Sequence, residues 1–185
     1  SSAASDVYKR QPSNIQNVLQ KERVFLEPEE AKAAVFYSIS NCQKGLTGIS
    51  FGNFLIKQVA TDLSYEFKNL KNFVTLSPIP GFRKWIRNKY PKLNVKIEKI
   101  KKSDQLLKIK YDLLNCFGEY FFKSERSDKM PNDPVARFHL GNGASLEQIN
   151  FLGDISSNGI ELSGGLMVNY LYDLEKVEQN HETFV

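Results

Sequence analysis

Residues 75–82 read Thr75-Leu76-Ser77-Pro78-Ile79-Pro80-Gly81-Phe82 and predict a stiff junction between a strand and a helix. Proline fixes its own φ angle and pushes the residue before it into an extended conformation, so neither Ser77 nor Ile79 fits inside a helix. The apolar run just before, residues 72–76, is typical of a strand. The Ser77 hydroxyl is therefore expected where this strand ends, held in one direction. A serine there also fits a local turn bond or the cap of a helix that begins near Phe82.

Strands and helices alternate along the rest of the chain. Residues 33–39 form an apolar run typical of a buried strand, and apolar residues recur at helical spacing from Phe51 to Phe67. The other expected elements are helices over residues 14–19 and from Phe82 through Trp85, a polar loop over 124–133, a helix capped by Ser145 and ended by Gly153, and a strand over 166–172. This alternation favours a mixed α/β layer.

The composition limits the kinds of ligand and partner that the chain is expected to bind. The 185 residues, 41% hydrophobic and 25% charged, fit one globular domain. No run approaches the roughly 20 apolar residues of a membrane span, so no membrane partner is expected. The formal net charge of +4 suits a ligand with phosphates. Lysines crowd between Lys92 and Lys110, but no aromatic residue is interleaved for base stacking before Tyr111, which favours a solvated helical face over a nucleic-acid site.

The two cysteines, Cys42 and Cys116, are too few for a disulfide framework and lack the paired spacing of a metal site. We therefore expect a reducing compartment and no bound metal.

Four segments together resemble the malonyl-CoA decarboxylase family, and they occur in the family's order. They are residues 37–59, 75–82, 133–144 and 165–172, and the resemblance runs from about Ala31 to His181. The third segment contains His139, one of only two histidines in the chain. Four matches in register are more specific than any one of them.

The resemblance implies a fold and a domain organisation. The fold is a mixed sheet flanked by helices, like that of the Gcn5-related acetyltransferases, and we expect it to be truncated at the N-terminus. Residues 1–11 are expected to be a foreign or disordered extension, and residues 12–185 a partial catalytic domain. In such a fragment the strand over residues 33–39 is left incompletely covered, and we expect poor solubility or no activity alone.

The resemblance also implies the activity, decarboxylation of malonyl-CoA to acetyl-CoA and CO₂ in fatty-acid or malonate metabolism. The family's catalytic pair carries over to Ser77 as proton acceptor and substrate contact and to His139 as proton donor. An imidazole suits the proton, since its unperturbed pKa is roughly 6.5. No cofactor is expected, because the thioester carbonyl itself accepts the electrons left when CO₂ departs. We expect a cytoplasmic, bacterial-like protein that forms homo-oligomers only at full length, while a mitochondrial or peroxisomal location stays open.

A glycine-rich entry to the helix over residues 51–67 leaves backbone N–H groups free for a pyrophosphate. By resemblance this entry is the coenzyme A cradle, formed by Thr47, Gly48, Ile49, Ser50, Phe51, Gly52 and Asn53. Further polar contacts to the substrate are expected from Ser38, Asn142 and Tyr172. Some family members carry a glutamate where this chain has Ser50, so a mechanism that uses that carboxylate does not transfer.

Two other functions stay open at this stage. One is a coenzyme A-dependent acyltransferase on the same fold, and the other is an inactive fragment that binds coenzyme A. Family members have an N-terminal helical oligomerisation domain and an early part of the catalytic domain, and we find neither in this sequence. A nucleophilic role for Ser77 would need a base and a third orienting group, and the sequence has no Gly-x-Ser-x-Gly elbow.

Overall fold

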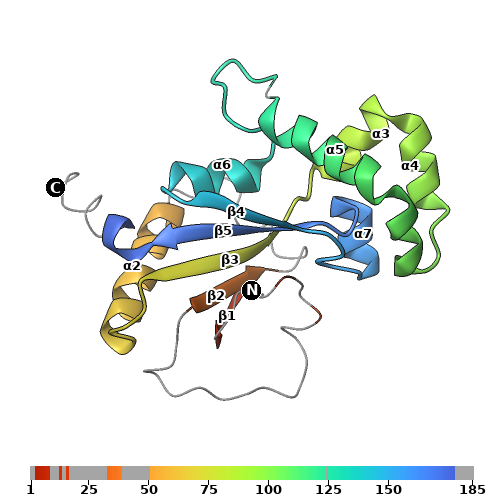
Figure 1. Cartoon of the computed structure of the whole chain (residues 1–185). Coiled ribbons are helices and arrows are strands. Elements are labelled where there is room, and N and C mark those ends of the chain that lie inside the picture. The colour runs from red at the N-terminus through yellow and green to blue at the C-terminus, as the bar shows by residue number, and fades with distance from the viewer. Residues whose placement is uncertain are drawn as a thin grey trace.

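A mixed five-stranded sheet forms the centre of the computed structural model, which describes residues 3–8, 13, 16, 33–38, 51–123 and 125–177 (Figure 1). The spatial order of the strands is β1-β2-β3-β5-β4. Their bounds are β1 (Ala3–Tyr8), β2 (Ala33–Ser38), β3 (Asn72–Pro78), β4 (Ser145–Asn150) and β5 (Met167–Asp173). β2 and β3 are parallel, and every other neighbouring pair is antiparallel.

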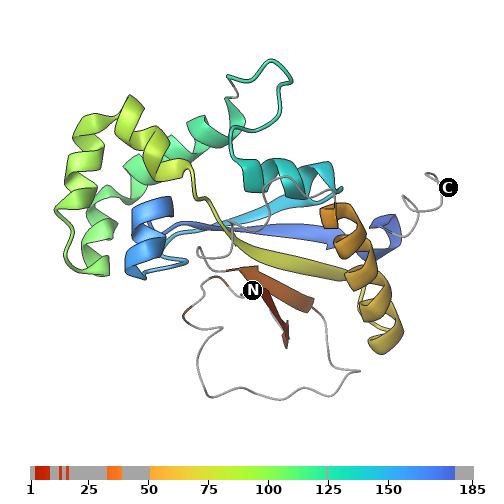
Figure 2. The same ribbon diagram turned by 180° about the vertical axis from the view of Figure 1, so that it is seen from behind.

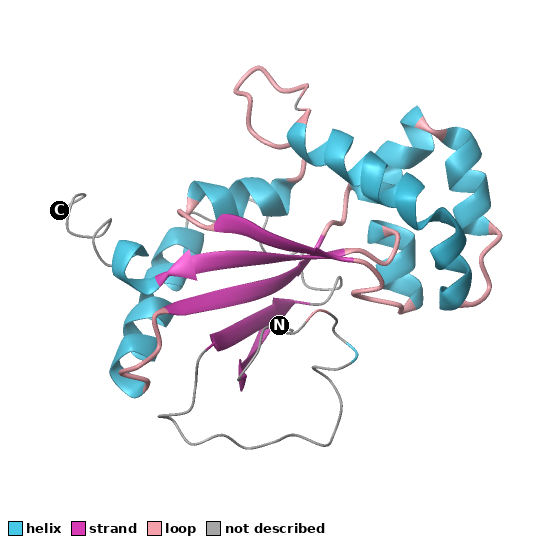
Figure 3. Ribbon diagram, viewed as in Figure 1, coloured by secondary structure: helices cyan, strands magenta, loops and turns pink. Residues whose placement is uncertain are grey.

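The helices gather at the two ends and on one face of this sheet. They are α2 (Phe51–Glu66), α3 (Phe82–Lys89), α4 (Pro91–Glu98), the 3₁₀ helix η3 (Ser103–Ile109), α5 (Lys110–Phe122), α6 (Pro134–Gly141) and α7 (Ser157–Ser163). α3, α4, α5 and α7 lie together beyond the carboxyl end of β3, whereas α2 lies at the other end of the sheet, as the view from behind also shows (Figure 2). Coloured by type, the strands form a single twisted layer (Figure 3).

Most of the elements expected from the sequence are confirmed. β2 and α2 match the predicted strand over 33–39 and helix over 51–67, and β5 matches the strand over 166–172. α3 begins at Phe82 as expected and continues to Lys89. The lysines of α4 and η3 are exposed, which agrees with a solvated helical face. The expected helix over residues 14–19 lies outside the described residues, apart from Gln16.

The prediction of a helix from Ser145 to Gly153 is wrong, because Ser145 begins β4. Leu146 and Ile149 are three residues apart, which is a helical spacing. A β-bulge between Leu146 and Gln148 adds one residue, so Leu146 pairs with Tyr170 and Ile149 pairs with Val168. The bulge thus places both apolar residues on one face of a strand despite the spacing.

The N-terminal segment also differs from expectation. Residues 3–8, expected to be part of a foreign or disordered extension, form β1 and pair with β2 along its length, from Ala3 opposite Ser38 to Tyr8 opposite Ala33. β2 is therefore paired on both sides, with β1 and with β3, whereas the strand over residues 33–39 was expected to be incompletely covered.

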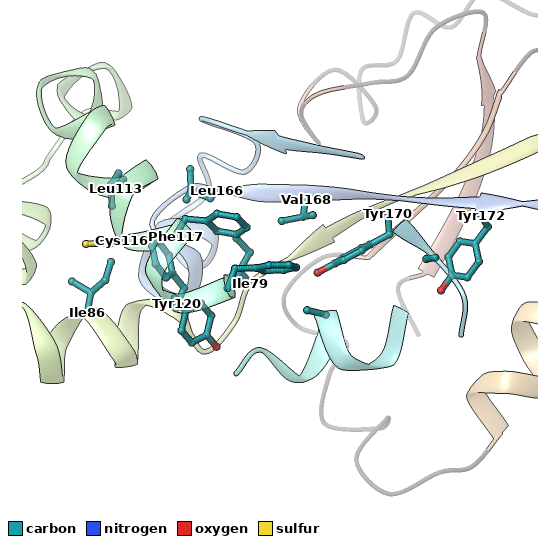
Figure 4. Packing of buried hydrophobic residues seen from close by; sticks show 14 of the residues in the cluster. Ile79, Ile86, Leu113, Cys116, Phe117, Tyr120, Leu166, Val168, Tyr170 and Tyr172 are labelled. Carbon is teal, nitrogen blue, oxygen red and sulfur yellow. The ribbon is translucent and has the colours of Figure 1, made fainter. Parts of the chain in front are cut away.

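One face of the sheet packs against α6, and its buried side chains join those of α3 and α5 in one core. From β5, Val168, Tyr170 and Tyr172 project to this face, and Figure 4 shows the two tyrosine rings lying along one side of the strand. Tyr172 stacks on its cross-strand partner Phe73, with ring centroids 4.6 Å apart and planes within 8°. Since side chains alternate along a strand, Thr75 and Ser77 share this face with Phe73.

A pair of glycine substitutions tests how closely α7 packs against the segment at Asp154. An added Cβ at Gly159 in α7 would lie 2.6 Å from the backbone oxygen of Asp154, whereas one at Gly118 in α5 would meet nothing within 4 Å. We expect Gly159→Ala to lower the free energy of unfolding by about 2 kcal/mol or more through overpacking. Gly118→Ala should raise it by about 0.5–1 kcal/mol, because alanine is the better helix former. Urea unfolding of both variants measures the two changes, and equal effects would contradict the packing described.

Candidate active site

The structure brings together the two residues expected to form the catalytic pair, which are 62 positions apart in the chain. Ser77 is the second-to-last residue of β3, which continues through Pro78 rather than ending at Leu76 as predicted. Its Oγ lies 3.3 Å from Nε2 of His139 on α6. Both side chains are buried, with 3% of Ser77 and 8% of His139 exposed.

The segment after Ser77 is held in place, as its two prolines predict. The Ile79 N–H donates to Ser163 Oγ at 3.0 Å, which ties it to the end of α7. The Phe82 N–H donates to the Ile79 carbonyl at 3.1 Å, which closes the turn into α3. Ser77 therefore sits on a strand end fixed by neighbours on both sides.

Local sequence also explains the position of His139. α6 begins with Pro134 in its first turn and is capped by Asp133, whose Oδ2 accepts the Ala136 N–H at 2.8 Å. Tyr120 of α5 donates to the other carboxylate oxygen of Asp133 at 3.3 Å. Ala136 and His139 are three residues apart, share one helix face and are buried. The cap and the apolar face together point His139 at the sheet.

Two tyrosines of β5 complete the surroundings of the imidazole. The Tyr172 hydroxyl lies 2.7 Å from His139 Nδ1. The ring of Tyr170 stacks on the imidazole, with centroids 4.4 Å apart and planes at 21°. Tyr172 was expected to contact the substrate, and the structure makes it the partner of the second ring nitrogen of His139.

Sequence reasoning missed Thr75 and Tyr170. Thr75 Oγ1 accepts a hydrogen bond from Ser77 Oγ at 3.0 Å, and its side chain is 5% exposed. The signal was available, because residues 75 and 77 alternate to the same face of a strand, as do residues 170 and 172. The sequence does not show that the two pairs lie opposite each other, which depends on the register of β3 with β5.

Burial controls the electrostatics of the site. It lowers the pKa of His139 to about 3, so the ring is neutral near neutral pH. The expectation that an unperturbed imidazole pKa suits the proton transfer is therefore wrong for this structure. Burial also raises the pKa of Tyr172 and of Tyr170, which keeps both phenols protonated. The pKa of Asp133 is raised to about 6 by the same cause.

Of the other expected site residues, some lie outside the described residues, and the rest are located on β2, α2 and α6. Residues 47–50 lie outside the described residues, and Phe51, Gly52 and Asn53 form the first turn of α2. Ser38 ends β2 one position after Tyr37, which pairs with Leu76, so Ser38 and Ser77 occupy equivalent positions on neighbouring parallel strands. Asn142 serves as the C-cap of α6, and its Nδ2 donates to the Phe138 carbonyl at 2.7 Å.

Within the described residues, no group of three or more histidine, cysteine or acidic side chains is arranged to hold a metal ion. Among the same residues, no helix is long and apolar enough to cross a bilayer.

Comparison with known proteins now decides the family. A family model described as "Malonyl-CoA decarboxylase C-terminal domain" matches residues 5–185. The chain belongs to this family. It is 35% identical to the mitochondrial malonyl-CoA decarboxylase of Anser anser anser over 209 residues, which cover 94% of this chain and 41% of that protein. The chain thus spans about two-fifths of the length of this curated relative.

Solved structures agree with the family and the fold. The crystal structure of malonyl-CoA decarboxylase from Rhodopseudomonas palustris matches with a TM-score of 0.79 and 44% identity, covering 97% of this chain and 44% of that one. The loading GNATL domain of CurA from Lyngbya majuscula matches with a TM-score of 0.56 at 13% identity, covering 94% and 70% of the two chains. The predicted acetyltransferase-like fold is confirmed.

The pKa of His139 predicts a pH-dependent stability. In the unfolded chain histidine titrates at roughly 6.5, so between that pH and about 3 the unfolded state binds a proton that the folded state rejects. We expect wild-type stability to fall across this window as the pH decreases, relative to His139→Gln, by at most ~1.4 kcal/mol per pH unit. Denaturant unfolding of both proteins from pH 7 to 4 measures the difference.

Asp133 titrates in the same window with the opposite sign. Its folded pKa is above the unfolded value, so its contribution to stability is lost as the pH rises through about 6. This contribution is common to both proteins and cancels in the comparison. Stability curves that stay parallel down to pH 4 would show that the imidazole is not desolvated.

Proposed function

We propose that this chain carries the catalytic pair of a malonyl-CoA decarboxylase and converts malonyl-CoA to acetyl-CoA and CO₂. The observation that supports it is the buried hydrogen-bonded series from Thr75 through Ser77 and His139 to Tyr172, in a chain of the malonyl-CoA decarboxylase family. The proposed setting is fatty-acid or malonate metabolism in the cytoplasm, with malonyl-CoA as the small-molecule partner and homo-oligomers at full length.

The reaction requires the protein to do two things. When the bond to the carboxylate breaks and CO₂ leaves, the electron pair passes into the thioester and forms an enolate. The protein has to stabilise the enolate oxygen with fixed donors and deliver a proton to the α-carbon. The thioester is its own electron sink, so these side chains need no cofactor for the step.

In this proposal His139 donates its Nε2 proton to the α-carbon. The ring is neutral, and an enolate carbon is basic enough to take a proton from a neutral imidazole. Tyr172, 2.7 Å from Nδ1, passes its hydroxyl proton to that nitrogen as the Nε2 proton leaves, so the ring carries no net charge after the transfer. After product release Nδ1 gives this proton back to the Tyr172 phenolate, and Nε2 takes a new proton from solvent. Ser77 contacts the substrate and accepts the hydrogen bond from Nε2 when the site is empty.

The cradle for coenzyme A is proposed at residues 47–53, including Thr47, Gly48, Ile49 and Ser50. β2 and β3 are parallel neighbours, and the chain between them passes through residues 39–50 and α2. In this proposal the backbone N–H groups at the start of α2 donate to the pyrophosphate of the ligand.

The same fold suits an acyltransferase, and product analysis separates the two activities. The protein is incubated with [3-¹⁴C]malonyl-CoA, with and without an added amine, and released ¹⁴CO₂ is counted beside acylated amine. We expect CO₂ and acetyl-CoA in equal amounts without any acceptor. Acylated amine with no CO₂ would contradict the proposal. A parallel assay joins the chain to the upstream part of a longer relative, because the chain covers 41% of such a protein.

Removing either member of the pair should act mainly on kcat and much less on KM. We expect Ser77→Ala and His139→Asn each to reduce kcat by roughly two to four decades, the range for losing a general acid or its partner. The double variant should be little slower than the single ones, because residues that act as a unit are not additive. Matched controls are Ser64→Ala on α2 and His181→Asn, which should keep wild-type turnover. Wild-type kcat in His139→Asn would remove the residue from the mechanism.

A larger side chain at the start of α2 should weaken coenzyme A binding. We expect Gly52→Val to raise the dissociation constant for coenzyme A by at least about tenfold, because the side chain would occupy space that the phosphates need. Calorimetry measures the affinity, and Gly118→Ala on α5 is the control for a glycine change in a helix far from the cradle. Unchanged affinity in a folded Gly52→Val protein would place the ligand elsewhere.

A further inference from the structure

Thr75 lies two residues before Ser77 on the same face of β3, and the proposed reaction gives it no role. Its Oγ1 is 3.0 Å from Ser77 Oγ, which is itself 3.3 Å from His139 Nε2. Across the strand pair, Thr75 lies opposite Tyr170, whose ring stacks on the imidazole. The Ser77 hydroxyl therefore has two hydrogen-bond partners, Thr75 and His139.

A serine hydroxyl has one proton and donates it to one partner. If Ser77 donates to Thr75, its lone pairs face His139, and Nε2 has to carry the proton of that hydrogen bond. If Ser77 instead donates to Nε2, that nitrogen is bare and the ring proton is on Nδ1. The direction of the Ser77 proton thus decides the tautomer of a neutral imidazole.

The distances around the ring favour a proton on Nε2. The 2.7 Å between the Tyr172 hydroxyl and Nδ1 is shorter than the usual 2.9–3.0 Å of an N–H donor, and fits a hydroxyl that donates to a bare nitrogen. A phenol is also more acidic than an aliphatic hydroxyl and hence the better donor. The 3.3 Å between Nε2 and Ser77 Oγ fits a longer N–H to oxygen bond.

We propose that Thr75 is a positioning residue that draws the Ser77 proton away from His139 and so keeps the ring proton on Nε2. The inference rests on the proposed decarboxylation, in which the Nε2 proton is the one delivered to the substrate. A neutral imidazole has one ring proton, so the other tautomer presents no proton to the substrate at this nitrogen. Thr75 thereby acts through Ser77 and does not touch the reacting atoms.

The test compares Thr75→Val with Thr75→Ser. Valine keeps the shape of the threonine but cannot accept the Ser77 proton, whereas serine keeps the hydroxyl. The tautomer is read from the ¹⁵N chemical shifts of the ring nitrogens in histidine-labelled protein. Since the chain has two histidines, the His181→Gln background leaves His139 as the single signal.

In the wild-type background we expect a protonated Nε2 and a bare Nδ1. In Thr75→Val the ratio of the Nδ1–H to the Nε2–H tautomer should rise by about fivefold, the effect of one lost hydrogen bond. The ¹⁵N chemical shifts of Nδ1 and Nε2 should therefore move toward each other. Thr75→Ser should restore the wild-type spectrum. With malonyl-CoA, Thr75→Val should lower kcat in proportion to the loss of the Nε2–H form seen in the spectra, with KM unchanged, and Thr75→Ser should restore wild-type kcat.

Two results would overturn the inference. One is an Nδ1–H tautomer in the His181→Gln protein with Thr75 unchanged. This result does not depend on the folding of a Thr75 variant. The other is an unchanged tautomer in folded Thr75→Val. The spectra do not depend on turnover, so the proposed function fails separately if the tautomers behave as expected while no CO₂ is released.

Discussion

The antiparallel pairing of β3 with β5 is the constraint on which the site depends. It sets Phe73, Thr75 and Ser77 opposite Tyr172, Tyr170 and Val168. A slip by one residue would turn one set of side chains to the other face of the sheet and separate the serine from both tyrosines. The stack of Phe73 on Tyr172 lies at one end of this paired region and fixes the register with apolar area. The polar groups therefore do not have to hold the strands together themselves.

Burying this row of hydroxyls and one imidazole is costly unless each group finds a partner. Thr75, Ser77, His139 and Tyr172 meet that requirement among themselves, and none of the four carries a charge near neutral pH. A charged imidazole here would need a counter-ion, and burial alone determines the direction of its pKa shift. These buried groups are thus satisfied by neutral hydrogen bonds alone, without a counter-ion.

Sequence alone was sufficient for much of the fold and for selecting Ser77 and His139, which the structure brings within hydrogen-bond distance. Apolar periodicity located β2, α2 and β5, and the prolines at 78 and 80 marked the end of β3. It failed at β4, where a bulge gave a strand the spacing of a helix, and at β1, where small polar residues gave no signal of pairing. Thr75 and Tyr170 were missed because their importance depends on cross-strand register. The pKa of His139 was misjudged because burial depends on α6, which the sequence did not identify as a helix.

The contacts of α6 connect the site to α3 and α5, beyond the carboxyl end of β3. Only eight residues long, this helix is anchored at its start by Asp133, whose carboxylate also accepts the Tyr120 hydroxyl from α5. Tyr120 in turn packs against Phe82 and Trp85 of α3. Because α3 follows Ser77 after a short stiff segment, both halves of the pair are attached to the same aromatic cluster. Disturbing that cluster would move Ser77 and His139 relative to each other, although none of its residues contacts either side chain in the described interactions.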